Sequence, residues 1–243
     1  MTYCLAIQLH DGIVFASDSR TSAGVDHVTT YRKMHVFDRF EDRIFVLLSA
    51  GNLATTQEVL SRIQRDLETD RGAQSLGSVP HLSDAARYVG ELSHAVQSRY
   101  AAALEKVGQT GEVTFIVGGQ IRDQPQDIHL VYPQGNFISA SPDAPYLQIG
   151  ETKYGKPILD RVIVPGLNLE DAARCALVSI DSTIRSNLSV GPPIELAIYE
   201  KGELALSHHL TLKRNSPYYV SLQKHWNQGI RRAFETLPRF DWE

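Results

Sequence analysis

The order of its apolar segments constrains the fold of this 243-residue chain more than any other feature of the sequence. A block of strand-forming segments comes first, two adjacent helical patterns follow, and strands and then helices return before a final hairpin. Blocks of strands separated from blocks of helices are typical of an α+β sandwich with antiparallel sheets in the middle. A Rossmann alternation of single strands and helices does not fit this order.

Alternation, turn residues and helix caps place the elements along the chain. The chain begins with a predicted hairpin of strands 2–10 and 13–17, because Asp11-Gly12 between them is a typical turn pair. Asn52 and Asn168 are the predicted N-caps of two helices, and Asn168 forms a capping-box-like start with Asp171. The other predicted strands are 43–49, 113–118, 127–132, 136–140, 194–199 and 203–208, and the predicted helices are one from 53 onward, 83–107, 154–160, 168–186 and 218–234.

Composition and charge favour one soluble globular domain spanning 1–243. The formal net charge of −4 does not suggest a nucleic-acid or membrane surface. The start of the chain does not resemble a signal peptide, and the longest apolar run, 44–48, is too short to span a bilayer. Two cysteines are too few for a disulfide framework or a cysteine-based zinc site, so we expect a cytoplasmic protein.

The last segment, 216–243, is predicted to be a C-terminal helical extension rich in aromatic residues. Its aromatic side chains pack either on their own domain or at an interface between subunits, and the second alternative is favoured. They are Tyr218, Tyr219, Trp226, Phe234 and Trp242.

Four short features stand in the first 51 residues. They are Thr2 directly behind Met1, the run Ala-Ser-Asp-Ser-Arg at 16–20, Lys33, and Ser-Ala-Gly at 49–51 between a strand and a helix. Each feature alone is weak, but their order and spacing resemble the proteasome β-subunit family. Over nearly the whole chain the pattern is similar to the ancestral bacterial branch of that family, known as Anbu. The resemblance implies an N-terminal nucleophile hydrolase fold, which is a four-layer αββα sandwich, and threonine peptidase activity.

The resemblance assigns the chemistry to Thr2, Asp18, Lys33 and Gly51. A threonine hydroxyl is a poor nucleophile without a base, and an N-terminal amine, with an unperturbed pKa of about 7.7–8.0, can be that base. The small residue after Met1 permits removal of the methionine, which would free the amine of Thr2. The Lys33 ammonium would lower the pKa of the Thr2 amine and hydroxyl, and Asp18 would neutralise the buried lysine. The Gly51 N–H would stabilise the oxyanion.

The same resemblance implies further site residues. The segment of Thr21 and Ser22 would pair with an extended peptide substrate, while Tyr31 and Leu53 would shape the pocket. Ser186 and Ser189 fall where the family supports the N-terminal amine, although Ser186 replaces the usual aspartate. Gly-Glu-Thr at 150–152 replaces a Gly-Ser-Gly, so a carboxylate would lie near the site.

Plainer alternatives exist for each of these residues. Thr2 could be an ordinary strand residue, Asp18 a turn residue, Lys33 a solvated charge, and Gly51 a break between strand and helix. Cys4 would point to the same face as Thr2, and a buried apolar role is favoured for it. The nine histidines form no metal-binding pattern, and no cofactor motif is present, so neither a metal nor a cofactor is expected.

Two other functions therefore stay open beside a peptidase. The same nucleophile could hydrolyse small amides or modified peptides, or the chain could be a catalytically silent assembly scaffold. The resemblance also implies self-association into rings, lock-washer-like assemblies or helices. It leaves an unfoldase partner open.

Overall fold

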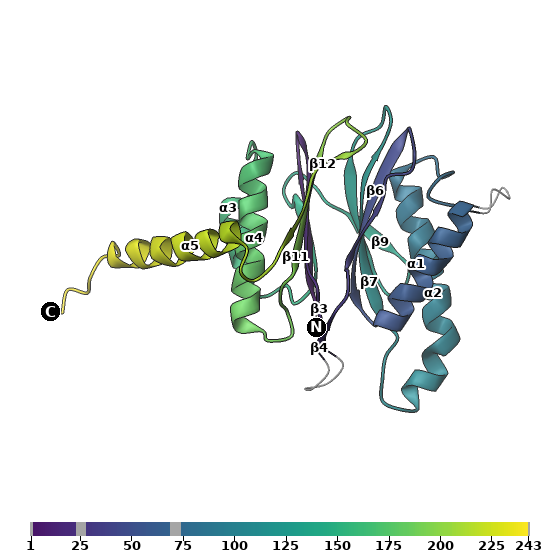
Figure 1. Cartoon of the computed structure of the whole chain (residues 1–243), viewed down its shortest axis with the longest axis horizontal. Helices are drawn as coiled ribbons and strands as arrows, with labels where there is room; N and C mark the ends of the chain where they lie inside the picture. The colour runs from purple at the N-terminus through teal and green to yellow at the C-terminus, as the bar shows by residue number, and fades with distance from the viewer. Residues whose placement is uncertain (1, 23–27, 69–73, 243) are drawn as a thin grey trace.

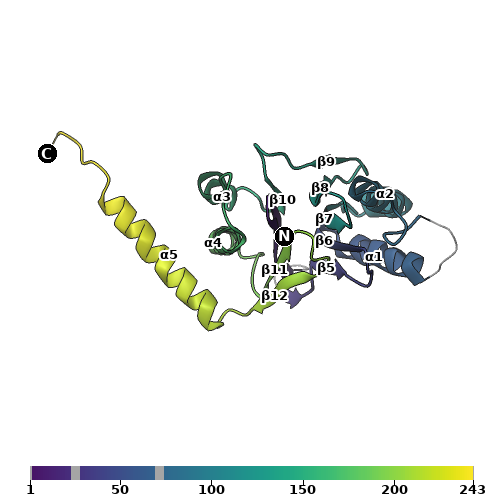
Figure 2. The ribbon, with the colours of Figure 1, turned by 90° about the horizontal axis from the view of Figure 1, so that it is seen from above.

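The computed structural model describes residues 2–22, 28–68 and 74–242 and arranges them in four layers. Two sheets are stacked in the middle, α1 and α2 cover one of them, and α3 and α4 cover the other (Figures 1 and 2). The predicted αββα sandwich is therefore confirmed.

Each sheet has five strands, and all the strand pairs within them are antiparallel. The first sheet has the order β10-β1-β2-β11-β12, with β10 Tyr146–Gly150, β1 Tyr3–Leu9, β2 Gly12–Asp18, β11 Ile194–Glu200 and β12 Leu206–Leu212. The second has the order β5-β6-β7-β8-β9, with β5 Met34–Phe37, β6 Arg43–Gly51, β7 Val113–Ile121, β8 Asp127–Val131 and β9 Phe137–Ser139. A small ribbon pairs β3 Arg20–Ser22 with β4 Val28–Thr30.

The helices border the sheets in two pairs. They are α1 Leu53–Glu68 and α2 Leu82–Glu105 on one side, and α3 Lys156–Val162 and α4 Leu169–Ser186 on the other, while α5 Pro217–Glu235 follows the last strand. Both predicted N-caps are confirmed, because Asn52 Oδ1 accepts the Thr55 N–H and Asn168 Oδ1 accepts the Asp171 N–H.

Both faces of the central strands are apolar because each face meets a different layer. On β1, Tyr3 and Leu5 pack under α3 and α4, whereas Cys4 and Ala6 pack between the two sheets. Successive side chains of a strand point to opposite faces, so one strand contributes to two cores. The same alternation on β6 explains why its sequence is almost continuously apolar.

The structure corrects two strand predictions. The predicted strand 203–208 is wrong in its bounds, since β12 begins at Leu206. Gln120 of the opposite sheet accepts the N–H of Gly202, and Leu204 has a φ of +52°, so the turn is longer than Lys201-Gly202 alone. The second correction adds β10, a strand that the sequence did not indicate and that pairs with β1.

Helix α5 leaves the sandwich as an arm (Figures 1 and 2). Its first turns are anchored, because the buried Tyr219 donates a hydrogen bond to Asp181 of α4 at 2.9 Å and Gln223 donates to the same oxygen. The rest of the described arm, residues 228–242, is exposed.

Candidate active site

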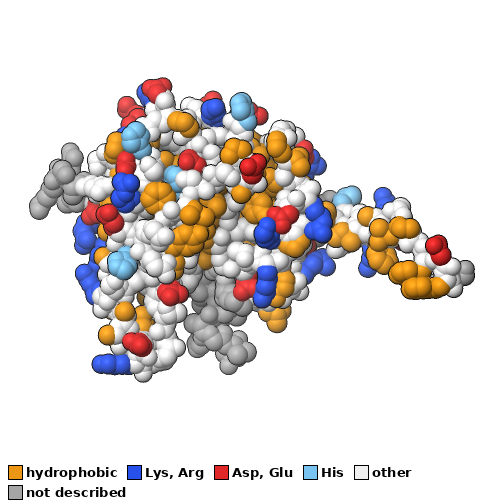
Figure 3. Space-filling view, turned by 180° about the vertical axis from the view of Figure 1, so that it is seen from behind, with side chains coloured by type: hydrophobic (Ala, Val, Ile, Leu, Met, Phe, Trp, Pro, Cys, Tyr) orange, Lys and Arg blue, Asp and Glu red, His pale blue; other side chains and the backbone are white. Residues whose placement is uncertain are grey.

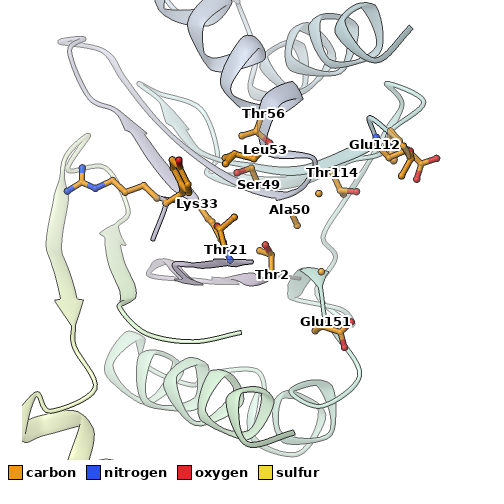
Figure 4. Close-up of a pocket in the computed structure, with 16 residues that line it drawn as sticks. Thr2, Thr21, Lys33, Ser49, Ala50, Leu53, Thr56, Glu112, Thr114 and Glu151 are labelled. Carbon is orange, nitrogen blue, oxygen red and sulfur yellow. Dashed lines mark hydrogen bonds between the residues drawn. The ribbon is translucent and has the colours of Figure 1, made fainter. Parts of the chain in front are cut away.

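A pocket of about 490 Å³ opens at the edge of the sheets where β1 and β5 begin and where β6 and β10 end. Figure 4 shows Thr2 in its centre, with Thr21 and Lys33 on one side, Ala50 above and Glu151 on the other. The pocket therefore gathers Thr2, Lys33, Gly51 and three of the four predicted substrate-binding residues. Its lining is Thr2, Thr21, Tyr31, Arg32, Lys33, Ser49, Ala50, Gly51, Leu53, Thr56, Thr110, Glu112, Thr114, Pro133, Gly150 and Glu151.

Asp18, the last residue of β2, is fully buried and accepts four hydrogen bonds. Its Oδ1 accepts the Tyr3 N–H at 3.0 Å and the Lys33 ammonium at 2.7 Å. Its Oδ2 accepts the N–H groups of Arg20 at 3.2 Å and Gly191 at 3.0 Å. A buried carboxylate is tolerated when it is paired and hydrogen-bonded in this way. The alternative of a simple turn residue does not account for these partners.

The Lys33 side chain is 6 % exposed, and its ammonium is held at a fixed place beside the pocket. Besides Asp18, it donates to the Arg20 carbonyl at 2.6 Å. An ammonium has three donors, so these two bonds leave a third for the pocket that Lys33 lines. Lys33 is therefore not the solvated charge of the plainer alternative.

Thr2 is placed by its neighbours on both sides. Its carbonyl accepts the Glu151 N–H at 2.7 Å, and Gly150, with a φ of +85°, passes so close that a Cβ there would lie 1.9 Å from that carbonyl oxygen. The next residue, Tyr3, is buried under α4 and hydrogen-bonds through its hydroxyl to Ser179 at 2.7 Å. Thr2 thus precedes a firmly anchored strand. Met1, whose removal is predicted, lies outside the described residues.

Gly51 ends β6, just before the Asn52 cap of α1. Its φ is +127°, and a Cβ would lie 2.3 Å from the Glu112 carbonyl oxygen, so the position requires glycine. The Ser49 N–H donates to the Lys33 carbonyl, and N–H groups two residues apart in a strand point to the same side. The Gly51 N–H therefore points toward the side of β6 on which Lys33 lies, next to the start of β5 at Met34.

Thr21, Tyr31 and Leu53 line the pocket as the resemblance implies. Of Ser22, only the backbone is described, and it pairs with Val28 in the β3–β4 ribbon. Glu151 also lines the pocket, which places a carboxylate there, and its nearest described cation is Lys153 at 3.9 Å.

Ser186 and Ser189 do not line the pocket. Ser186 is exposed, and the Ser189 hydroxyl donates to Asn187 at 2.6 Å. The loop after α4 instead reaches the site through Gly191, whose N–H binds Asp18, and through Leu188, whose carbonyl accepts the Arg20 guanidinium. Sequence reasoning missed Gly191 and the Arg20 side chain in this role. The proposed support of the amine by Ser186 and Ser189 stays a prediction.

Cys4 is fully buried, as predicted, and its side chain packs between the sheets. Burial raises the pKa of its thiol, and its Sγ faces the Ser49 carbonyl at 3.7 Å, so it is not an activated nucleophile. In the described ranges, no three His, Cys, Asp or Glu side chains are placed to hold a metal ion. Nor does any helix of this part of the chain have the length and apolar character needed to cross a membrane.

Comparisons with known proteins agree with this geometry. Residues 2–199 match the proteasome subunit family. A proteasome subunit beta type-9 from Oryzias latipes is 30 % identical over 128 residues, which are 51 % of this chain and 57 % of that protein. The chain thus spans little more than half the length of the curated relatives it matches.

Solved structures are similar over the full length. The ancestral β-subunit, Anbu, from Yersinia bercovieri is 41 % identical, with a TM-score of 0.92 over 99 % of this chain and 100 % of that one. A helical assembly of the Anbu complex from Pseudomonas aeruginosa is 44 % identical, with a TM-score of 0.91 over 99 % of this chain and 98 % of that one. The chain therefore belongs to the proteasome subunit family and, within it, to the Anbu group.

Proposed function

We propose that the chain is a threonine-type peptidase of the N-terminal nucleophile class, with Thr2 as nucleophile after removal of Met1. The observation that carries this proposal is the buried Lys33–Asp18 pair, whose ammonium lines the same pocket as Thr2. The proposal assumes a cytoplasmic enzyme without a cofactor.

In the proposed reaction, the free amine of Thr2 takes the proton of the Thr2 hydroxyl, and Oγ1 attacks the substrate carbonyl. The Lys33 ammonium favours the neutral amine and stabilises the developing alkoxide. The Gly51 N–H stabilises the negative charge on the carbonyl oxygen. The amine of Thr2 then protonates the departing amine, which leaves an ester on Oγ1, and water hydrolyses this ester in the second half.

Strand β3 is the proposed binding edge to which an extended peptide would add as a further strand. It pairs with β4 on one side, and Thr21 of this strand lines the pocket. Main-chain hydrogen bonds to an added strand bind peptides without regard to their side chains. Thr21 and Ser22 would supply these bonds, while Tyr31 and Leu53 would contact the residue before the cleaved bond.

The intact mass of the protein before and after treatment with a peptide vinyl sulfone tests the proposal. We expect a mass that lacks Met1 and then a single adduct, because the Thr2 hydroxyl adds across the vinyl group without loss of atoms. Peptide mapping should place the adduct on Thr2. Correctly processed protein that gains no adduct would count against the proposal, and a retained Met1 would favour the scaffold alternative.

A substrate panel separates the two hydrolytic functions. Unfolded proteins, peptides and small amides are supplied to the processed enzyme, and the released amines are quantified. Cleavage of peptides supports the peptidase, whereas activity confined to small amides would assign the enzyme to the alternative class.

We further propose that the chain self-associates through the extension 216–243. The far end of the arm exposes apolar side chains that its own domain does not cover, as Figure 3 shows. Exposed apolar clusters of this kind mark interaction sites. They are Ile230, Phe234, Leu237, Phe240 and Trp242, which are 49–78 % exposed, and the rings of Phe240 and Trp242 stack at 4.0 Å. The similar Pseudomonas aeruginosa protein was solved as a helical assembly.

Ending the chain after Asn227 tests the arm, because it keeps Tyr219 and Gln223 on α4 and removes the exposed apolar end. We expect the oligomer to dissociate into smaller species in sedimentation velocity, while circular dichroism stays close to that of the full chain. Replacing Phe240 and Trp242 by serine in the full chain is the matched control for length. An unchanged sedimentation profile in both variants would reject the interface.

A further inference from the structure

A second buried carboxylate lies beside the Asp18–Lys33 pair. Glu195 of β11 is 3 % exposed and pairs with Ser17 of β2, while its neighbour Ile194 pairs with Asp18. Its Oε2 has no hydrogen-bond partner among the described residues. A buried carboxylate without full compensation lowers stability, and burial raises its pKa. Packing alone does not explain its presence.

The contacts of Glu195 are with the two residues that flank Lys33. The Arg32 Nε lies 3.4 Å from its Oε1, although the Arg32 side chain is otherwise mostly exposed. The Met34 N–H also lies close enough to the carboxylate to lower its pKa. Met34 begins β5 of the second sheet and Arg32 lies two residues before it, whereas Glu195 belongs to the first sheet. This carboxylate therefore bridges the two sheets at the segment 32–34.

Backbone geometry explains why Met34 needs this partner. The Lys33 carbonyl accepts the Ser49 N–H of β6, and the carbonyl and N–H of one trans peptide point in opposite directions. The Met34 N–H therefore points away from β6, and among the described strands β5 is the edge of its sheet. Glu195 supplies the acceptor that a neighbouring strand would otherwise provide.

The segment 32–34 is thus fixed at three points. The Ser49 N–H holds the Lys33 carbonyl, Glu195 faces Met34 and Arg32, and Asp18 and the Arg20 carbonyl hold the Lys33 ammonium. If the middle point is lost, the backbone of residues 32–34 keeps its bond to Ser49 of the second sheet, and the nearest backbone bond toward the first sheet is that of the Tyr31 N–H to the Ser19 carbonyl at 3.0 Å. Asp18 belongs to the first sheet, so the geometry of the Lys33–Asp18 pair then depends on the spacing between the sheets.

We propose that Glu195 is a positioning residue for the reaction, and that it ties residues 32–34 to the first sheet so that the Lys33 ammonium stays beside Thr2. The inference rests on the proposed function of Thr2. Glu195 is not among the residues that line the pocket, so it acts through Lys33. A displacement of about 1 Å in a catalytic group can lower a rate about 100-fold, so a small movement of this segment is sufficient for a large effect.

Glu195→Leu and Glu195→Gln test the proposal together. Leucine fills a similar volume and accepts no hydrogen bond, and replacing a buried charge by an apolar side chain is often neutral or stabilising. Glutamine keeps an oxygen that accepts the Met34 N–H. We expect the leucine variant to keep its melting temperature and KM while kcat falls by about tenfold or more. The glutamine variant should keep kcat within about threefold.

A purely structural role of Glu195 would leave the pH profile of the reaction unchanged, so this profile distinguishes the two roles. The charged groups facing Glu195 are Arg32 and His209, and these are unchanged in both variants. With Lys33 displaced, the pKa of the Thr2 amine should rise toward the unperturbed value of about 7.7–8.0. The acid limb of kcat/KM should therefore move to higher pH in the leucine variant and stay in place in the glutamine variant.

Gln120→Leu is the control for loss of a buried polar group. Gln120 is buried between the same sheets and binds Tyr199 and Gly202 near the opposite end of β11. We expect it to lose stability and to keep its acid limb and kcat. If the leucine variant at 195 does not fold, Glu195→Asp replaces it, because the shorter side chain withdraws the carboxylate from Met34.

Crystal structures of the variants keep the inference separate from the proposed function. We expect the distance from Lys33 Nζ to Asp18 Oδ1, 2.7 Å here, to lengthen in Glu195→Leu and to persist in Glu195→Gln. Wild-type protein that does not react with the vinyl sulfone would overturn the proposed function, and these distances would still test the position of Lys33. An unchanged distance, an unchanged kcat in Glu195→Leu, or equal losses in the leucine and glutamine variants would overturn the role of Glu195.

Discussion

Thr2→Ala is expected to lower peptide turnover by about 1000-fold or more, because it removes the hydroxyl that belongs to the same residue as the N-terminal amine. The change should leave the fold intact, since the structure uses the Thr2 backbone carbonyl, which binds Glu151, to hold this residue. Alanine is small enough for Met1 to be removed as before. Initial rates on a fluorogenic peptide, with processing verified by intact mass, measure the effect.

Thr2→Ser is the matched control, because it keeps the hydroxyl and the amine. We expect it to form the vinyl sulfone adduct, whereas the alanine variant should form none at residue 2. An alanine variant with turnover within tenfold of wild type would show that another group carries the reaction.

Lys33→Met is expected to impair both activity and stability. The substitution leaves the Asp18 carboxylate buried without its cation, and removal of one partner from a buried ion pair typically costs about 3–5 kcal/mol. It also removes the positive charge that lowers the pKa of the Thr2 amine and hydroxyl, so turnover should fall about 100-fold or more. Urea unfolding measures the first effect, and the initial rate measures the second.

The double variant with Asp18→Asn and Lys33→Met separates the two effects. An asparagine at 18 carries no charge, so we expect most of the lost free energy of unfolding to return while activity stays low. A single Lys33→Met variant that is as stable as wild type, or that keeps its turnover, would contradict the pairing described here.

Features with local causes were predictable from the sequence. Asp11-Gly12 indicated the first hairpin, and Asn52 and Asn168 indicated helix starts, because each acts on residues within one turn of itself. The central strands of both sheets were recognisable from their apolar sequences, since the two faces of each strand pack against different cores. The exposed edge strand β12 was displaced in the prediction, because its His208, His209 and Leu210 provide no apolar alternation.

The residues that complete the candidate site were less predictable. Thr2, Lys33 and Gly51 were found through a resemblance, and the alternation of the strands alone would not have assigned them a role. Gly191 binds Asp18 across 173 positions of sequence, and no spacing rule connects residues so far apart. The same holds for Glu195, whose contact with Arg32 joins β11 to the segment before β5 across 163 positions of sequence.

The four donors to Asp18 come from Tyr3, Arg20, Lys33 and Gly191, so they span most of the chain. During translation, residue 2 leaves the ribosome long before residue 191 is made. The carboxylate that holds the lysine therefore cannot acquire its full set of partners on a nascent chain. Under the proposed function, the Thr2 nucleophile would therefore gain a fully partnered Lys33–Asp18 pair only when synthesis of the sandwich is almost finished.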